Sequence, residues 1–325
     1  MRARARCGAE PAVSRVVTLG ESMGLIRGDG IGGWEHLASG RIDTGGAEGN
    51  TAIGLARLGT PVTWLGRVGD DALGRRVAGD LRSEGVQVEA VVDPQAPTGV
   101  MLKSAPRAGS TVVDYYRRGS AGSRLDPRDL DRLDFAGCGI LHVTGVTLAL
   151  SESARATVHD AVSRAKAAGA LISFAVNHRA KLWPADEARA SYERVIATAD
   201  IVFASDEEAR MLRPGADAES LAAALADAGP GEVVVTLGAD GAVASIDGEI
   251  HRVMAEPITP VDTVGAGDAF AAGYLAERLA GETPVRRLRT AALAGAFACL
   301  HPGDWQGAPR RAELDRRPSG DPVAR

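Results

Sequence analysis

Apolar segments of two kinds alternate along most of this 325-residue chain, and this alternation limits the folds that it can adopt. Segments of the first kind are short and rich in Val, Ile and Leu, as buried strands are: 16–20, 62–66, 86–92, 140–143, 171–175, 201–204 and 232–237. Segments of the second kind carry apolar residues at helical spacing: 52–58, 72–84, 151–168 and 284–300. Because parallel strands need helical crossovers, this order predicts an α/β fold with helices on both faces of a mainly parallel sheet.

Two further segments predict a smaller β structure beside the main sheet. Residues 99–103 and 111–117 read as strands joined by a turn that contains Pro and Gly. With the region 22–44 they suit a small lid over the edge of the sheet. Because an exposed strand edge offers unpaired backbone groups to another chain, we expect a homo-oligomer.

These patterns predict a single domain over residues 15–310, with lid segments at about 22–44 and 97–118. Residues 1–14 carry several Arg without an apolar stretch behind them and read as a disordered extension. Residues 311–325 are rich in Arg, Pro and Asp and read as a flexible tail.

Composition argues against several classes of function. The formal net charge of −5 gives no electrostatic case for binding nucleic acid or an anionic membrane. No apolar run approaches the length of a membrane-spanning helix. Cys7, Cys138 and Cys299 are far apart and lack metal-site spacing, so the simplest interpretation is a reduced, cytoplasmic protein.

The stretch D-T-V-G-A-G-D-A-F-A-A-G at 262–273 is the most informative local pattern. It places Gly265, Ala266 and Gly267 at the start of a predicted helix, where unpaired N–H groups and the helix dipole favour an anion such as phosphate. Asp268 follows, and a carboxylate held ionised at a helix start could take a proton from a hydroxyl. An anion hole beside a base suits phosphoryl transfer to an alcohol. The same pattern equally suits a Gly-rich turn whose Asp caps a helix.

This stretch resembles the C-terminal signature of the ribokinase-like, phosphofructokinase-B-type sugar kinases. The stretch G-G-A-E-G-N-T-A at 45–52, followed by L-A-R-L-G and G-R-V-G-D-D-A-L-G, resembles the N-terminal signature of the same family. The resemblance covers roughly residues 15–310. It implies a three-layer ribokinase-like fold with a β lid, a kinase that uses ATP and Mg²⁺, and compatibility with a monovalent cation such as K⁺.

The resemblance also implies roles for particular residues. Asp268 would be the catalytic base, and Gly265, Ala266 and Gly267 would form the anion hole. Glu208 would help to organise Mg²⁺ through water. The implied nucleotide-binding residues are Ser205, Thr236, Gly238 and Gly241. The implied sugar-binding residues are Gly46, Asn50, Tyr115, Arg117, Asn177, Arg179 and Asp304.

Spacing adds to the implied sugar site. Tyr115 and Arg117 are two residues apart in a predicted strand and therefore share a face, where a hydroxyl and a guanidinium suit a polyhydroxy carboxylate. The same spacing also suits an ordinary amphipathic edge strand. Asn177 and Arg179 follow the end of a predicted strand, and ligands of open α/β sheets collect at such ends.

Within the family, the stretches Y-Y-R-R-G-S-A-G-S, V-N-H-R and G-D-W-Q-G-A-P are most similar to 2-keto-3-deoxygluconate kinases. The resemblance therefore implies phosphorylation of this sugar acid to its 6-phosphate. Three positions depart from the pattern: Ala175 replaces a usual Asp, Met101 an expected Tyr, and Ser205 a frequent Asn.

These departures keep other functions open. A fructokinase or another deoxygluconate kinase is one alternative, although a neutral sugar would leave Arg117 and Arg179 without an anion to pair with. A non-catalytic sugar- or nucleotide-binding protein of the same fold is another, and the presence of Asp268 argues against it.

Overall fold

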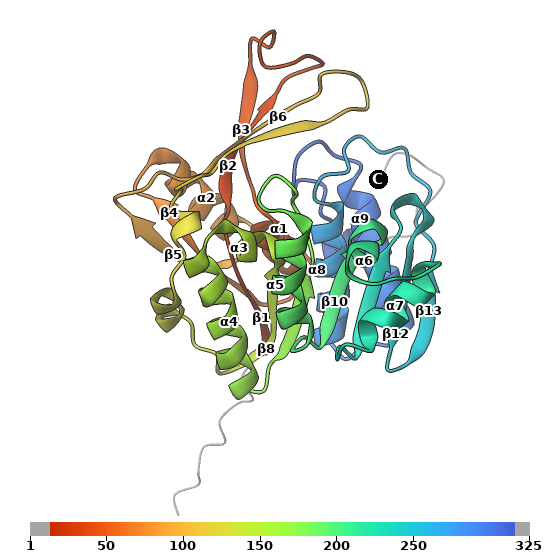
Figure 1. Ribbon diagram of the computed structural model, residues 1–325. Coiled ribbons are helices and arrows are strands. Elements are labelled where there is room, and N and C mark those ends of the chain that lie inside the picture. Colours follow the sequence, from red (N-terminus) through yellow and green to blue (C-terminus); the bar gives the residue numbers. More distant parts are fainter. Residues whose placement is uncertain (1–13, 316–325) are drawn as a thin grey trace, which may run out of the picture.

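The computed structural model describes residues 14–315, and its elements alternate between strand and helix along the chain (Figure 1). The strands of the main sheet are β1 (Arg15–Leu19), β4 (Val62–Gly69), β5 (Gln87–Asp93), β8 (Cys138–Thr144), β9 (Leu171–Ala175), β10 (Ile201–Ser205), β11 (Glu232–Thr236), β12 (Ala242–Ile246) and β13 (Glu249–Val253). The α-helices are α1 (Ala47–Arg57), α2 (Ala72–Ser83), α3 (Gly145–Leu150), α4 (Glu152–Ala167), α5 (Ala185–Ile196), α6 (Asp206–Leu212), α7 (Ala218–Ala226), α8 (Ala266–Leu279), α9 (Pro284–Ala298) and α10 (Arg311–Asp315).

The main sheet has the order β13-β12-β11-β10-β9-β8-β1-β4-β5 within the described residues. Neighbouring strands from β5 to β11 run parallel, while β12 pairs antiparallel with β11 and with β13. The prediction of a mainly parallel sheet is confirmed. Parallel strands end at the same edge of a sheet, so the loops that follow β8, β9, β10 and β11 meet there.

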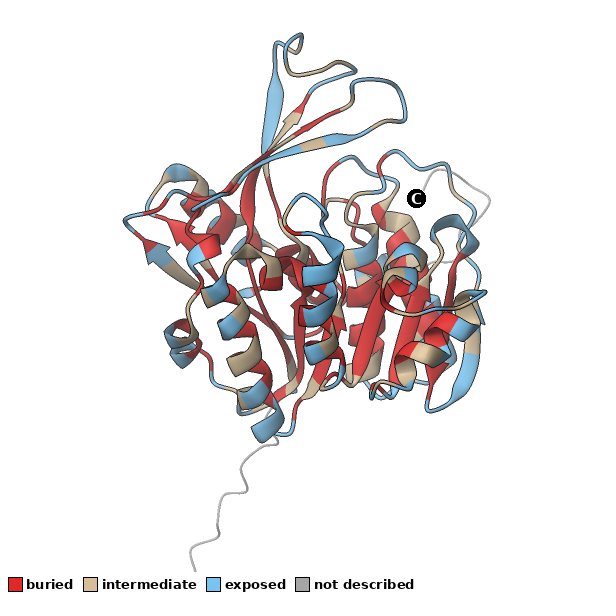
Figure 2. Cartoon of the chain, in the orientation of Figure 1, coloured by how far each residue is buried: buried red, intermediate tan, exposed pale blue. Residues whose placement is uncertain are grey.

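Two apolar cores lie on opposite faces of this sheet. Successive residues of β1 show the alternation, since Val17 contributes to one core and Val16 to the other. Helices α3 to α7 contribute residues to the first core, and α1, α2, α8 and α9 contribute residues to the second. Figure 2 shows the buried strands between helices whose outer surfaces are exposed. The three-layer arrangement is confirmed.

A separate four-stranded sheet forms the lid. Its strands, β2 (Met23–Gly28), β3 (Gly40–Gly45), β6 (Val100–Ser104) and β7 (Val112–Tyr116), have the order β3-β2-β6-β7. The lid projects from the edge of the main sheet where β1 leads into β2 (Figure 1). These strands lie in the two segments expected from the sequence to form the lid, about 22–44 and 97–118, above the edge where the site loops gather.

The ends of the chain differ in part from the prediction. Residues 311–315 form α10 rather than tail, and the Arg311 guanidinium pairs with Glu277 and donates to the carbonyl of Leu58 at 3.2 Å. Residues 1–13 and 316–325, where the extension and most of the tail were predicted, lie outside the described residues. Within residues 14–315, none of the helices combines the length and apolar character that crossing a membrane requires.

Candidate active site

A cavity of about 420 Å³ lies where the carboxyl ends of the central strands meet. It is lined by several residues that the sequence singled out, from segments far apart in the chain: Asn177, Arg179, Ser205, Glu208, Thr236, Gly267 and Asp268. Ala175, His142 and Phe203 contribute to its wall. The predicted base Asp268 thus shares one cavity with Gly267 of the predicted anion hole and with two predicted nucleotide-binding residues, Ser205 and Thr236.

The Gly-rich turn forms the start of α8. Gly265 is the N-cap with a left-handed φ of 81°, and a Cβ at this position would overlap the carbonyl oxygen of Asp304. The Gly265 and Gly267 N–H groups have no hydrogen-bond acceptor within residues 14–315. The expectation that all the turn's N–H groups are unpaired is wrong for Ala266, which donates to the Thr263 carbonyl at 3.3 Å.

Asp268 occupies the first turn of α8 and faces two amides. The Asn50 side chain donates to Oδ2 of Asp268 at 2.8 Å, and the Asn177 side chain donates to Oδ1 at 3.5 Å. Burial nevertheless raises the pKa of Asp268 to about 7, against the opposing effects of Asn50 and Arg179. The expectation that this carboxylate is easily held ionised is therefore wrong, because the loss of solvent outweighs the helix start. A group with this pKa can accept a proton near neutral pH.

Arg117 already has a carboxylate partner. Its Nη2 and Nε atoms lie 2.6 and 2.7 Å from Oε2 of Glu21, and both side chains are buried. Glu21 also accepts a hydrogen bond from Ser120. The Arg117 guanidinium lies 5.6 Å from the Tyr115 ring, although Arg117 follows the end of β7 at Tyr116. The Glu21 pairing was not expected, and it neutralises the charge proposed to bind a substrate carboxylate.

Arg179 differs from Arg117 because its contacts are all to neutral groups. The guanidinium donates to the His178 carbonyl and to Oδ1 of Asn177, each at 3.0 Å, and the residue is exposed in the cavity wall. Asn177 has a left-handed φ of 43°, which turns the chain sharply after β9. No salt bridge to Arg179 is present in residues 14–315. Arg179 is therefore a cation available to an anionic ligand.

Glu208 connects two segments of the cavity wall. Its Oε1 accepts the backbone N–H of His178 at 2.7 Å, and its Oε2 accepts the N–H of Ser205 at 2.9 Å. The Ser205 hydroxyl in turn accepts the N–H of Glu208, which completes a capping box at the start of α6. Both carboxylate oxygens of Glu208, which the resemblance assigns to Mg²⁺, thus already accept a hydrogen bond from a backbone N–H group. The neighbouring Glu207 is exposed and lines the same cavity.

A second cavity of about 730 Å³ adjoins the first, and the two share Ser205, Glu207 and Thr236 in their walls. Gly238 lines it with a left-handed φ of 59°. Gly241, with a φ of 93°, closes the turn where a Cβ would overlap the Val253 carbonyl oxygen. The two cavities therefore adjoin where β10 and β11 end. No cluster of three potential metal-binding side chains lies within the described part of the chain.

The remaining predicted sugar-binding residues do not line the first cavity: Gly46, Asn50, Tyr115, Arg117 and Asp304. Gly46 is the N-cap of α1, and a Cβ there would overlap the carbonyl oxygen of Glu21. Asp304 is buried and pairs with Lys103 of the lid at 3.3 Å. Lys103 also contacts Asp262 at 2.5 Å. Sequence reasoning missed this lysine, because a single Lys in an apolar strand usually reaches solvent.

His142 is a second residue that the sequence did not mark. It lies fully buried on β8 in the cavity floor, with Nδ1 3.0 Å from the hydroxyl of Ser173. Burial lowers the pKa of His142 to about 4, so the ring is neutral at neutral pH. Because His142 lies in an otherwise apolar segment, the sequence predicted a buried strand there but not that this side chain lines a cavity.

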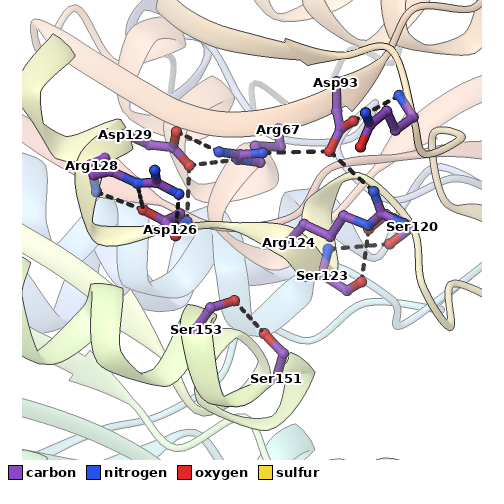
Figure 3. A network of polar contacts seen from close by, with 11 residues as sticks. Arg67, Asp93, Ser120, Ser123, Arg124, Asp126, Arg128, Asp129, Ser151 and Ser153 are labelled. Carbon is purple, nitrogen blue, oxygen red and sulfur yellow. Dashed lines mark hydrogen bonds and ion pairs between the residues drawn. The ribbon is translucent and has the colours of Figure 1, made fainter.

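A third cavity, of about 850 Å³, lies apart from this site and is also lined by arginines (Figure 3). Arg67 lies between Asp129 and Asp93, with distances of 2.6 and 3.4 Å. Arg128 pairs with Asp126 at 2.8 Å. Because these charges neutralise one another, the third cavity lacks the free cation that Arg179 provides in the first.

The model of the pfkB family of carbohydrate kinases matches residues 15–311. Two relatives are 2-dehydro-3-deoxygluconokinases: that of Bacillus subtilis (strain 168) is 35% identical and covers 92% of this chain and 93% of its own length. That of Thermoproteus tenax is 34% identical and covers 96% of this chain and 98% of its own. A fructokinase of Klebsiella pneumoniae is also 35% identical and covers 84% of this chain and 91% of its own.

Solved structures similar to this chain include proteins of the same kind. A PfkB protein from Polaromonas sp. JS666 has a TM-score of 0.86 and 34% identity, over 94% of this chain and 100% of that one. An E. coli protein described as ribokinase II, solved with ATP and Mg²⁺, has a TM-score of 0.86 and 28% identity, over 93% and 98%. A Vibrio cholerae O395 fructokinase double mutant, solved with fructose, ADP and potassium ion, has a TM-score of 0.83 and 29% identity, over 94% and 98%.

Proposed function

The chain belongs to the pfkB family of carbohydrate kinases and is similar to 2-dehydro-3-deoxygluconokinases, and from this premise we propose that it phosphorylates a sugar acid with ATP. The proposed acceptor is 2-keto-3-deoxygluconate, another name for 2-dehydro-3-deoxygluconate, and the proposed product is its 6-phosphate. The substrate's carboxylate distinguishes this proposal from a kinase for neutral sugars.

One observation carries the choice of an acid. Arg179 lines the cavity that contains Asp268, and its guanidinium contacts only neutral groups. A guanidinium forms strong, charge-assisted hydrogen bonds with a carboxylate. We therefore assign Arg179 to the carboxylate of the acceptor. Asn177, Tyr115, Asn50, Gly46 and Asp304 remain proposed neighbours of the sugar.

The proposed reaction uses Asp268 as the base. As the acceptor oxygen attacks the γ-phosphorus, its proton passes to Asp268 while the bond to the β-phosphate oxygen breaks. A positioned base is worth about 10²- to 10⁴-fold in rate. In this proposal the N–H groups of Gly265 and Gly267, which have no acceptor within residues 14–315, stabilise charge on the transferred group. The pKa of Asp268, about 7, suits a base that works near neutrality.

The residues present fit a nucleotide that lies along the two adjoining cavities. Thr236 and Ser205 belong to both walls, and Gly238, where an added Cβ would meet no atom within 4 Å, leaves space for close approach. ATP supplies the phosphoryl group, and Mg²⁺ would screen its negative charge. Because residues 14–315 contain no cluster of metal ligands, we propose that Mg²⁺ is held mainly by phosphate oxygens and water, with Glu207 or Glu208 nearby.

Fructose is the second candidate acceptor. Fructokinases are among the relatives at similar identity, and the pairing of Arg117 with Glu21 removes one of the two cations expected to meet a carboxylate. A neutral sugar would leave Arg179 facing solvent. The two candidates therefore differ in whether Arg179 contributes to acceptor affinity.

An assay across acceptors tests the proposal. ADP release is measured with 2-keto-3-deoxygluconate, gluconate, fructose and ribose, with and without EDTA, and with K⁺ exchanged for Na⁺. We expect the highest kcat/KM with 2-keto-3-deoxygluconate and loss of turnover in EDTA. Faster turnover of fructose than of either acid would favour the second candidate, and no ADP release with any acceptor would contradict the proposed activity.

A further inference from the structure

Lys103 lies on lid strand β6, but its ammonium contacts segments outside the lid. Nζ lies 2.5 Å from Oδ2 of Asp262 and 3.3 Å from Oδ1 of Asp304. It also donates to the carbonyl of Gly303 at 3.2 Å. The Lys103 side chain is 4% exposed, and each of the two carboxylate side chains is 7% exposed. A buried lysine of this kind is rare unless it is paired, so the contact is built into the fold.

One of the two carboxylates that Lys103 contacts, that of Asp262, also accepts hydrogen bonds from backbone N–H groups. Asp262 accepts the N–H of Val264 through Oδ1 at 3.2 Å and the N–H of Gly303 through Oδ2 at 3.3 Å. Segments 262–264 and 303–304 are thus connected through Asp262, with the Lys103 ammonium between them. Burial raises the pKa of Asp304, and Lys103 opposes that effect. The Lys103 ammonium is therefore the counter-ion that offsets the cost of burying these two acidic side chains.

The same cluster reaches the proposed reaction centre by two short routes. The first is backbone contact, because the Asp304 carbonyl lies so close to Gly265 that no side chain fits between them. The second is the Asn50 amide, which stabilises the carboxylate of Asp304 and donates to Asp268 at 2.8 Å. A displacement of Asp304 would therefore reach the anion-hole turn and the base together.

We propose that Lys103 is a positioning residue that couples docking of the lid to assembly of the phosphoryl-transfer site. When β6 is docked, its ammonium holds segments 262–264 and 303–304 in the arrangement that places the Gly265 turn and Asp268. When β6 moves away, two carboxylates near the turn lose their counter-ion and oppose the approach of a phosphate. The inference rests on the proposed function, in which phosphate binds at this turn.

Substitution of Lys103 tests the coupling in the full-length protein. Lys103→Met should lower kcat on the order of 10²-fold, the loss that about 1 Å of misplacement can cause, while KM for ATP changes less than about threefold. Lys103→Arg keeps the charge and should restore kcat to within about tenfold of wild type. The matched control is Lys166→Met, whose Nζ donates to the Thr198 carbonyl at 2.8 Å on an exposed surface far from the lid. It should leave both constants unchanged.

A double-mutant cycle separates positioning from general destabilisation. Asn50 donates to Asp268 and lowers the pKa of Asp304, so Asn50→Ala should remove part of the effect of Lys103→Met, and the two losses in kcat should not multiply fully. If Lys103→Met alone fails to fold, the cycle is run with Lys103→Met, Asp262→Asn and Asp304→Asn combined, which removes the ammonium and both carboxylates together. Losses that multiply fully, or a Lys103→Met enzyme within about threefold of wild-type kcat, would overturn the proposal.

Hydrogen exchange provides a readout that needs no activity. In the protein without ligands, Lys103→Met should speed amide exchange both in lid segment 100–104 and in segments 262–266 and 303–308, while Lys166→Met should not. Faster exchange confined to the lid would contradict the coupling. A wild-type protein without kinase activity but with the coupled exchange would instead reject the proposed function and leave the coupling standing.

Discussion

At Asp268, opposing effects act on one carboxyl group. Loss of solvent favours the neutral acid, whereas the Asn50 amide and the Arg179 charge favour the carboxylate, and the balance raises the pKa to about 7. The raised pKa makes Asp268 a stronger base. An Asp with its ordinary pKa of 3.8 would be a weaker base toward a hydroxyl proton. A group that titrates near neutrality also makes the enzyme sensitive to pH.

The pH profile of activity should report this group. Asp268 must be ionised to accept a proton, so log kcat/KM should fall with a slope of about one per pH unit below about pH 7. The profile is measured by coupled assay from about pH 5.5 to pH 8.5 with a fixed acceptor. A flat profile through neutral pH would mean that the titrating base lies elsewhere.

Stability should respond to the same carboxyl group in the opposite direction. Its folded pKa, about 7, exceeds the ordinary value of 3.8, so its contribution to stability is complete below the lower value and is lost as pH rises through the higher one. Asp268→Asn removes this loss. Its free energy of unfolding should therefore gain on wild type between about pH 5 and pH 8, by at most about 2.7 kcal/mol, because about two pH units separate pH 5 from the folded pKa of about 7. Denaturant titration at both pH values measures the gain, and a constant difference would contradict the pKa.

Substitution of Arg179 and of Arg117, the two arginines first expected to bind a substrate carboxylate, should have different effects. Arg179→Leu should raise KM for a sugar acid far more than KM for fructose, since truncating one partner of a charge pair that the bound acid would desolvate costs about 2–5 kcal/mol. Arg117→Leu leaves Glu21 buried without its counter-ion, so it should lower the free energy of unfolding by about 3–5 kcal/mol. Steady-state kinetics and denaturant titration on both variants distinguish the roles. Equal changes in KM for acid and neutral sugars in Arg179→Leu would rule out carboxylate recognition.

At the level of elements, the lid is a sheet with two unlike faces. The inner face carries Met23, Leu25, Met101 and Lys103, all buried. The opposite face carries Ile42 and Tyr116, which are 51% and 66% exposed. Register places Ile26 beside Ile42 and Leu102 beside Ile26, so an apolar row crosses the lid. Met101, which replaces the expected Tyr, belongs to the lid's own apolar cluster.

The exposed apolar face of the lid supports the expectation of a homo-oligomer. Tyr116→Asp and Ile42→Asp should each shift the protein toward the monomer, because a charge placed in an apolar interface loses its water. Light scattering coupled to size-exclusion chromatography measures the mass. The control is Val285→Asp on α9, a residue that is 67% exposed outside the lid. A wild-type protein that is monomeric at all concentrations would disprove the expectation.

Elements with strong local patterns could be predicted from the sequence. The strand predicted at 171–175 is β9 with the same bounds, and the helix predicted at 151–168 is α4, whose N-cap Ser151 accepts the N–H of Ala154. Helices α3, α5 and α7 were not assigned. Helix α3 has only six residues and continues the apolar run of β8, while α7 is rich in Ala and Leu around its circumference and lacks a clear polar face.

At the level of the whole molecule, the site depends on contacts between residues far apart in the sequence. Family signatures placed Asn50, Asn177 and Asp268 in one site, and the hydrogen bonds of both amides to the carboxyl group agree with that. The partners of Arg117 and Asp304 could not be predicted, because Glu21 and Lys103 carry no local motif. Only the packing of the lid against the main domain brings these charges together.

The central claim is that Asp268 acts as the base at the Gly265–Gly267 turn of an ATP-dependent kinase. Its most direct test is kcat of Asp268→Asn by coupled assay, with ATP affinity measured by calorimetry on the same preparation. We predict a loss in kcat of about 10²- to 10⁴-fold with ATP affinity retained, because the N–H groups of the turn remain. Asp262→Asn, which precedes the turn, should reduce kcat less. Retention of more than about a tenth of wild-type kcat by Asp268→Asn would contradict the claim, since it falls well short of the range for a general base.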